Sequence, residues 1–150
     1  MSLAMTRAER EAFLAEVHVG IIAIERAGGA PLCVPIWYDY APETGVWIIT
    51  ERHSQKGRAL AAAGRFALCA QVETPPAYRY ASVEGPIVET APAELETHRR
   101  PMARRYFGVA LGDQYVAGES GEENLVFTMR PERWRTVDYA KLGSFPGPDA

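Results

Sequence analysis

The chain has 150 residues, of which 47% are hydrophobic and 23% are charged, so it is long enough to bury a core as one globular domain. Its formal net charge of -3 and pI near 5.6 argue against the broad basic surface of nucleic-acid-binding proteins. No apolar run approaches the roughly 20 residues of a membrane-spanning helix, and the N-terminus lacks a secretion signal. We therefore expect a cytoplasmic protein that binds neither nucleic acid nor membrane.

The first predicted element is a helix that follows Thr6 and ends near Val17. Thr6 and Glu9 form a T-x-x-E capping box, in which each side chain accepts a hydrogen bond from a free amide. Residues 1–4 resemble a cloning remnant and are left out of the fold. The tail 143–150 is expected to be frayed.

Three strands are predicted next, in the segments HVGIIAIE (18–25), LCVPIWYDY (32–40) and VWIIT (46–50). The first two flank the turn sequence RAGGAP and should pair as a hairpin. Cys33 and Cys69 each lie in an apolar strand segment and are expected to be small core residues. No HxxxH or CxxC spacing indicates a metal site.

A short helix is predicted over residues 55–63, with Ser54 as its N-cap and Gly64 at its end. Gly57 weakens the first turn, which either a close backbone approach or sequence drift would explain. Strands are predicted at 65–73 and 78–89. The Gly85-Pro86 pair in the second implies a bulge or an edge position.

The remaining sequence predicts a helix over 91–108, which Pro101 should kink or split. A short helical turn and a loop are expected in 109–123, and two strands around a proline turn in 124–139. Regular alternation of strands and helices is absent. The predicted fold is therefore mainly β with helices: a single domain over 1–150, built as a mostly antiparallel β-barrel with short helices at its rim.

Cations are concentrated where the helix at 55–63 begins. A helix N-terminus presents unpaired amides and a partial positive charge, which together attract anions. With Ser54 as cap, Lys56 and Arg58 are both predicted to reach the volume that these amides face, and such convergence suits a phosphate. The alternative is a solvated turn with its cations on the surface. The segment is not a P-loop.

Two long segments, VPIWYDYAPETGVWIITERHSQKGRAL and GRFALCAQVETPPAYRYASVEGPIVE, resemble the pyridoxamine 5'-phosphate oxidase-like split barrels. The resemblance is strongest to small members that use FMN or the deazaflavin coenzyme F-420, and it covers about residues 18–135. It implies an FMN-binding split barrel that forms a homodimer. It also implies an oxidoreductase that transfers hydride to or from a small-molecule substrate.

The same resemblance implies a set of cofactor-binding residues. The phosphate would be bound by Lys56 and Arg58 with Ser54 and Gln55 nearby, Thr50 would lie near the phosphate or ribityl chain, Pro35, Ile36 and Trp37 would line the ring, and Tyr78, Arg79 and Tyr80 would come from the partner subunit. No catalytic residue is assigned, because the chemistry belongs to the cofactor.

Other interpretations remain open at this stage. The C-terminal sequence does not reproduce the basic substrate-binding region of true pyridoxamine phosphate oxidases, so vitamin B6 oxidation is not expected. Trp37 could pack in the core or at a dimer contact instead of against a flavin. A non-catalytic flavin or haem carrier is the alternative function, with candidate iron ligands His18, His53 and His98.

A cluster of arginines lies in the helix predicted at 91–108 and comprises Arg99, Arg100, Arg104 and Arg105. These side chains could bind a polyanionic tail such as oligoglutamate. Alternatively they form a solvated helix face paired with Glu94 and Glu96.

Overall fold

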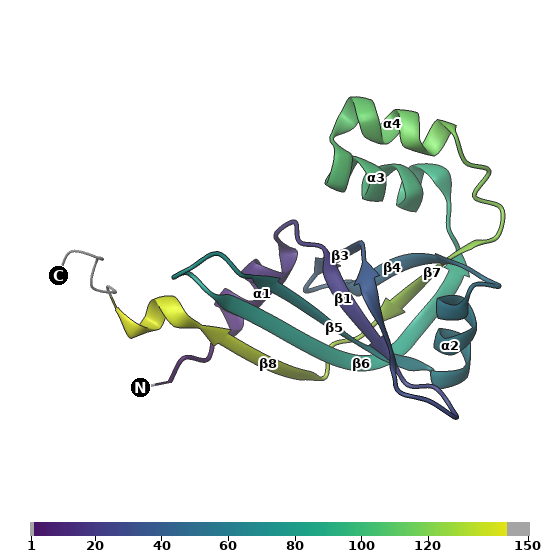
Figure 1. Ribbon diagram of the computed structural model, residues 1–150. Coiled ribbons are helices and arrows are strands. Elements are labelled where there is room, and N and C mark those ends of the chain that lie inside the picture. Colours follow the sequence, from purple (N-terminus) through teal and green to yellow (C-terminus); the bar gives the residue numbers. More distant parts are fainter. Residues whose placement is uncertain (1, 144–150) are drawn as a thin grey trace.

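The computed structural model describes residues 2–143, and the part of the predicted frayed tail beyond Gly143 lies outside them. Eight strands in this range form one curled sheet in which all pairs are antiparallel. The order along the sheet is β2-β1-β5-β6-β7-β4-β3, and β8 pairs with β6 (Figure 1). The predicted antiparallel barrel with helices is confirmed. No helix among residues 2–143 combines the length and apolar character needed to cross a membrane.

The bounds of these elements are as follows. The strands are β1 (Gly20–Ile24), β2 (Leu32–Ile36), β3 (Tyr38–Ala41), β4 (Gly45–Glu51), β5 (Arg65–Val72), β6 (Arg79–Pro92), β7 (Asn124–Met129) and β8 (Arg133–Asp138). The helices are α1 (Arg7–Ala15), α2 (Gln55–Ala63), the π-helical turn η1 (Leu95–Arg99), α3 (Arg100–Phe107), α4 (Val109–Ala117) and the 3-10 turn η2 (Tyr139–Leu142).

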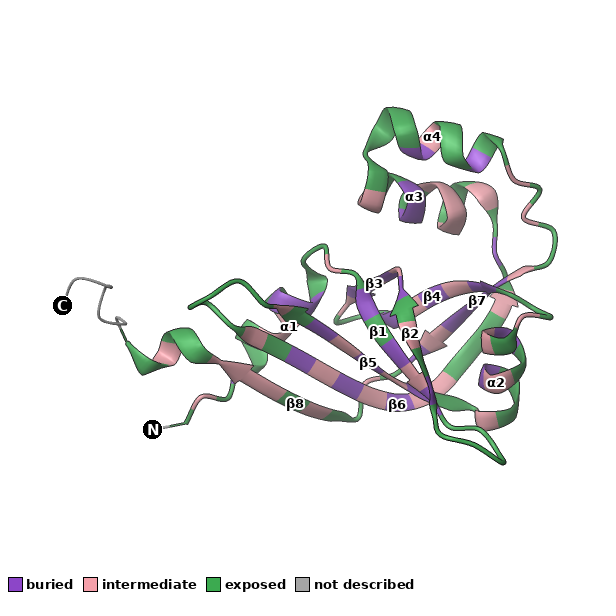
Figure 2. Cartoon of the chain, viewed as in Figure 1, coloured by how far each residue is buried: buried purple, intermediate pink, exposed green. Residues whose placement is uncertain are grey.

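The concave side of the curled sheet holds the core. Along β5 and β6, buried residues such as Leu68 and Val83 alternate with more exposed ones, as expected for strands with one covered face (Figure 2). Helix α1 adds Phe13 and Leu14 to this core. Its start confirms the predicted capping box, because the Thr6 hydroxyl accepts from the Glu9 amide.

The segment 32–40, predicted as one strand, is two strands that break at Trp37. Strand β2 pairs with β1, where Ile36 lies opposite Gly20, whereas β3 pairs with β4, where Tyr38 lies opposite Ile48. These two strands are the ends of the sheet path, and the curl brings those ends together. A single apolar run therefore supplies both edges, and Trp37 lies at the seam between them.

Helix α2 is seated tightly on the end of β4. The Ser54 hydroxyl accepts from the Gly57 amide at 3.0 Å, and the helix ends at Gly64 with φ of 68°. Gly57 is buried, and a Cβ there would lie 2.7 Å from the Arg52 carbonyl oxygen and closer still to that of Glu51. A close backbone approach, and not sequence drift, therefore explains this glycine.

Strand β6 changes partners at the Gly85-Pro86 pair. Its pairing with β5 ends at Pro86, its pairing with β7 begins at Ile87, and the register shifts between Ile87 and Glu89. The predicted bulge is confirmed.

The two cysteines differ from the prediction that both are core residues. Cys33 is exposed and Cys69 is partly buried. Both belong to strands whose alternate side chains face away from the core, so the apolar composition of these segments does not place every residue inside.

Helices α3 and α4 form a helical hairpin that stands over one end of the barrel (Figure 1). Pro101 lies in the first turn of α3, directly after η1, so the predicted split of the helix at this proline is confirmed. The helical part of 109–123 is longer than the predicted short turn, because α4 has nine residues, and the rest of this segment is a loop as predicted. Gly112 lets α4 approach α3 closely, because a Cβ there would lie 2.8 Å from the Arg104 amide nitrogen. Packing on α3 thus stabilises a helix with little periodicity of its own.

Asp113 holds the helical hairpin together. Its carboxylate accepts from Arg104 Nε at 2.8 Å and from Arg100 Nη1 at 3.0 Å, and Arg100 also pairs with Glu96. These two guanidinium groups, Arg104 first, lower the pKa of Asp113 to about 2. The arginine cluster is therefore not a single solvated face paired with Glu94 and Glu96, since most of its members are bound elsewhere.

We expect Asp113→Asn to destabilise the protein at neutral pH and not at strongly acidic pH. A carboxylate whose pKa falls from 3.8 to about 2 on folding stabilises the fold fully above pH 3.8, and this stabilisation is lost as the pH falls through 2. Urea unfolding midpoints of wild type and variant should differ at pH 6 and converge between pH 4 and 2. A difference that persists at pH 2 would contradict this origin. Glu122→Gln, at an exposed carboxylate, is the control.

We expect Gly57→Ala to lower the free energy of unfolding by about 1 to 3 kcal/mol, the scale of overpacking a close contact. In an ordinary helix the same change would stabilise, so the sign is diagnostic. Gly29→Ala is the matched control, because its added Cβ would come no closer than 3.7 Å to another residue. Chemical denaturation of both variants measures the difference, and an equal or greater stability of Gly57→Ala would refute the close approach.

Candidate functional site

A cavity of about 370 Å³ lies between the helical hairpin and the end of the barrel, within the size range of small-molecule sites. Five regions supply its walls: the residue before β1, the end of β2, the end of β4, the start of α2, and the hairpin with its flanking segments. The residues that line it are Val19, Pro35, Ile36, Trp37, Ile49, Thr50, Glu51, Lys56, Arg99, Met102, Ala103, Tyr115, Glu119 and Asn124.

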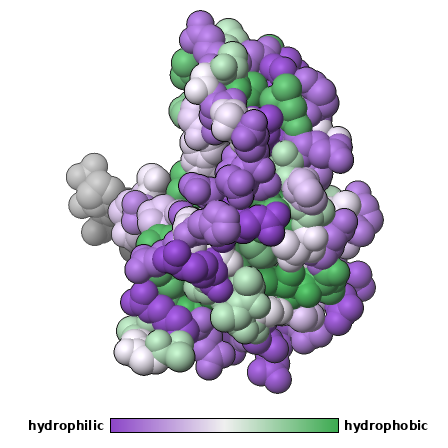
Figure 3. Space-filling view, turned by 90° about the vertical axis from the view of Figure 1, so that its right-hand side faces the viewer, coloured by the Kyte–Doolittle hydropathy of each residue, from purple (hydrophilic) through white to green (hydrophobic). Residues whose placement is uncertain are grey.

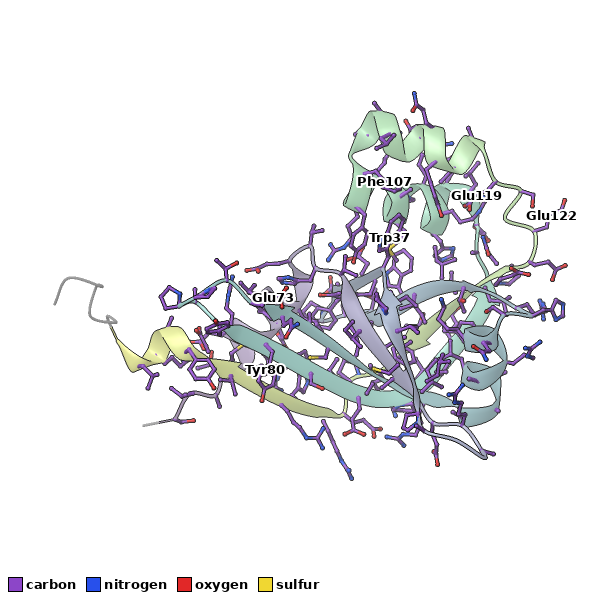
Figure 4. All side chains as sticks on the ribbon, in the orientation of Figure 1. Trp37, Glu73, Tyr80, Phe107, Glu119 and Glu122 are labelled. Atoms are coloured by element: carbon purple, nitrogen blue, oxygen red, sulfur yellow. The ribbon has the colours of Figure 1, made fainter. Side chains whose placement is uncertain are left out.

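Trp37 forms an aromatic wall of this cavity at the seam of the barrel. Its indole stacks on Tyr106 with ring centres 4.9 Å apart and an angle of 8° between the planes, and Phe107 meets it edge-on at 4.9 Å. Figure 4 shows Trp37 between the barrel and the hairpin, below Phe107. The side chain therefore packs against the hairpin, a contact that the sequence did not predict, and also lines the cavity.

The hydroxyl of Tyr106 joins the hairpin to both sides of the seam. It accepts from the Tyr38 amide at 3.0 Å and donates to the His18 carbonyl at 2.6 Å. Tyr38 begins β3, and His18 precedes β1. Burial raises the pKa of Tyr106, so this hydroxyl keeps its proton at physiological pH. The hairpin wall of the cavity is thereby fixed to the barrel wall.

The start of α2 supplies the cationic end of the cavity. Lys56 lines it together with Thr50, whose hydroxyl lies 3.2 Å from that of Ser54. The Ser54 side chain caps the Gly57 amide, and its carbonyl accepts from the Arg58 amide at 3.0 Å. The backbone amides of Gln55 and Lys56, at the first two positions of the helix, have no hydrogen-bond partner among the described residues.

The structure does not bring Arg58 or Gln55 to this cavity. Both side chains are exposed, and neither lines it. Successive helical residues are about 100° apart, so Lys56 and Arg58 point in nearly opposite directions around α2. The predicted convergence of both cations on one volume fails within a single chain, and Lys56 alone reaches it.

Tyr78, Arg79 and Tyr80 lie at a different place. They line a second cavity of about 580 Å³, with neighbours that include Glu73 and Tyr139. In Figure 4, Tyr80 and Glu73 lie toward the other end of the barrel from Trp37. Within one chain these three residues therefore take no part in the cavity that Lys56 lines.

On the hairpin side of the cavity, the sequence singled out only Arg99, as one of four arginines that could bind a polyanionic tail, and did not connect it with this cavity. Arg99 ends η1, and Met102, Ala103, Tyr115 and Glu119 follow it along the hairpin. Nothing in the sequence joins this insertion to residues near position 50. Its one local signal is the break at Gly108, which allows two helices to fold back on each other.

Next to the lining residues Glu51 and Asn124, polar side chains of two segments contact each other. Arg52 and His53, which follow β4, lie 3.7 Å and 3.5 Å from the Glu123 carboxylate that precedes β7. Figure 3, which views the molecule from the right-hand side of Figure 1, shows hydrophilic residues on the face between hairpin and barrel. Hydrophilic residues therefore lie at the surface beside this cavity, whose lining contains both apolar and charged side chains.

Histidine does not line this cavity in the part of the chain that the structure describes. The His18 ring nitrogen lies 3.1 Å from the Phe13 carbonyl oxygen, and His98 accepts from the Glu94 amide. Residues 2–143 contain no group of three or more His, Cys, Asp or Glu side chains placed to hold a metal ion.

Solved structures of the same fold are numerous. A conserved hypothetical protein of Mycobacterium tuberculosis has a TM-score of 0.74 at 23% identity, covering 99% of this chain and 96% of its own. An F420 reductase has a TM-score of 0.61 at 21% identity, with 83% and 94% covered. A haem storage protein of Vibrio cholerae has a TM-score of 0.61 at 16% identity, with 92% and 96% covered.

These identities are low, so the structures show the fold alone. No protein of curated function matches the sequence significantly. A family model described as pyridoxamine 5'-phosphate oxidase matches residues 6–138, which is most of the chain and includes every element from α1 to β8. The chain therefore belongs to the pyridoxamine 5'-phosphate oxidase family.

Proposed function

We propose that the cavity between hairpin and barrel binds FMN or the deazaflavin coenzyme F-420, and that the chain is an oxidoreductase acting on a small molecule. The observation that carries this proposal is the placement of Lys56, at the start of α2, in one cavity with Trp37. A cation beside unpaired helix amides suits a phosphate, and an apolar aromatic wall suits a ring system. Structural relatives named as an F420 reductase and a FAD-binding protein support the same cofactor class.

The residues present fit such a cofactor. Lys56 would pair with the phosphate, and Thr50 and Ser54 would lie beside it. Pro35 and Ile36, at the end of β2, would contact the ring and exclude water from it together with Trp37. When bound, the cofactor supplies the hydride chemistry, so no acid or base of the chain is required for that step.

A homodimer completes this proposal. The outward faces of β1 and β2 carry the exposed residues Ile21, Cys33 and Pro35, and an apolar sheet face of this kind favours association. Pro35 is both exposed and part of the cavity lining, so a partner seated on this face would border the cofactor. The partner is the proposed source of Tyr78, Arg79 and Tyr80. We place the protein in the cytoplasm, where free thiols such as Cys33 stay reduced.

A carrier of flavin or haem without turnover is the second candidate. Structural relatives named as haem-binding and haem storage proteins favour it. Its candidate iron ligands His18, His53 and His98 do not line the cavity, which makes it the weaker of the two. Titration with haem distinguishes them, because histidine ligation shifts and sharpens the Soret band of haem, whereas a protein that binds only flavin leaves that band unchanged.

We expect Lys56→Ala to weaken binding of the cofactor by about 1.5 to 3 kcal/mol, the scale of a hydrogen bond to a charged group. Fluorescence titration of the purified protein with FMN and with F-420 measures this and shows which cofactor is preferred. Arg58→Ala is the matched control, because it removes a cation from the same helix at an exposed position outside the cavity. Equal affinity in wild type and Lys56→Ala would remove this lysine from the site, and no spectral change with either cofactor would end the proposal.

We expect the wild type to sediment with a mass near 33 kDa, twice the 16.5 kDa of one chain. Ile21→Glu should shift this mass toward that of the monomer, because it places a charge on the outward face of β1. Val88→Glu is the control, since Val88 is also exposed but lies near the β6 bulge. Sedimentation equilibrium decides, and a monomeric wild type is the contrary outcome.

A further inference from the structure

The lining of the cavity contains two cations from different elements. Lys56 lies at the start of α2, and Arg99 lies on the hairpin side at the end of η1. The Arg99 side chain is only 11% exposed. Its one charged neighbour among the described residues is Glu119, whose Oε1 lies 3.5 Å from Arg99 Nη1, the outer limit of a hydrogen bond.

The Nε atom of Arg99 is buried without a hydrogen-bond partner, a feature shared by two other arginines in residues 2–143. Those two are compensated elsewhere. Arg10 lies over the Trp134 ring at 4.6 Å, and Arg105 donates to backbone carbonyls and pairs with Asp39 at 3.2 Å. Arg99 is the one of the three that lines the cavity. A buried cation with a single marginal partner is costly, so an anion that contacts the accessible part of this guanidinium from the cavity would offset that cost.

The surrounding backbone fixes the orientation of this guanidinium. The loop after α4 passes against it at Gly121, where φ is 67° and any Cβ would overlap the guanidinium group. Glu119 comes from the same loop, and Figure 4 shows it on the hairpin side of the cavity. A held, planar guanidinium presents paired donors that match the two oxygens of a carboxylate.

The wall next to Arg99 is apolar and aromatic, because Trp37, Met102 and Tyr115 line it. A ligand that satisfies both features has a flat conjugated body and a carboxylate at one end. Lys56 is already assigned to the cofactor phosphate, which leaves Arg99 as the lining cation for the substrate.

We propose that Arg99 binds the carboxylate of a planar, conjugated substrate, which displaces Glu119 from the guanidinium. The identification of the ligand as a substrate rests on the proposed function. The carboxylate site at Arg99 does not depend on that function. Arg99 acts as a substrate-binding residue, and Glu119 is its counterion in the free protein.

Isothermal titration calorimetry of the full, cofactor-free chain tests the site with cinnamate and its neutral isostere cinnamamide. Wild type should bind cinnamate about tenfold or more tightly than cinnamamide, a difference on the scale of a hydrogen bond to a charged group. Arg99→Gln should abolish this preference, and Arg99→Lys should keep part of it. Arg58→Ala, which removes an exposed cation outside the cavity, is the control and should leave the preference unchanged.

Glu119→Gln provides a second test that keeps Arg99 in place. It should raise the affinity for cinnamate, because the ligand no longer competes with the internal carboxylate. Equal binding of cinnamate and cinnamamide by wild type would overturn the site. So would an unchanged preference in Arg99→Gln, or an unchanged cinnamate affinity in Glu119→Gln.

The cofactor titrations separate the two sources of a carboxylate. FMN has none, whereas the tail of F-420 carries several. If the carboxylate is the substrate's, Arg99→Gln should bind FMN and F-420 as wild type does. A loss of affinity for F-420 alone would assign the carboxylate to the cofactor tail and overturn the substrate assignment. Failure of wild type to bind either cofactor would contradict the proposed function, yet the preference for cinnamate would still be measured.

Discussion

The architecture of the cavity depends on one hydroxyl group, that of Tyr106, at the seam of the barrel. Chain continuity through Trp37 forces the two ends of the sheet path together, but neighbouring strands do not pair across that junction. The Tyr106 hydroxyl accepts a hydrogen bond from the Tyr38 amide on one side of the junction and donates one to the His18 carbonyl on the other. Because buried backbone groups need partners, this bond stabilises the seam and anchors the hairpin above it in the same contact.

The two cations in the cavity lining, Lys56 and Arg99, are kept in position by different kinds of contact. Lys56 is placed by backbone packing, since Gly57 seats α2 directly on the end of β4. Arg99 is placed by side-chain and loop contacts, which involve Glu119 and Gly121. The proposed phosphate site, fixed by backbone packing, is expected to be rigid. A guanidinium whose only counterion is a marginal one can exchange it for a ligand.

The predictions that held rest on signals confined to a few neighbouring residues. The Thr6 and Glu9 capping box, the Ser54 cap and the split at Pro101 each follow from local backbone chemistry, which tertiary packing does not change. The predictions that failed depended on the direction in which a side chain points, which the local sequence does not specify. Cys33 lies in an apolar strand yet points outward, and Arg58 lies beside Lys56 in sequence yet on the opposite side of α2.

By itself the sequence determined the fold class, the helix starts and the family resemblance. The patterns that indicate strands, helices and helix caps each depend on residues that are close together in the chain. Tertiary structure alone decided that one apolar run serves both edges of the sheet at Trp37, and that residues near positions 37, 50 and 99 share a cavity. The curl of the sheet and the packing of α4 on α3 bring these segments together. Such contacts join residues far apart in the chain, so no local pattern records them.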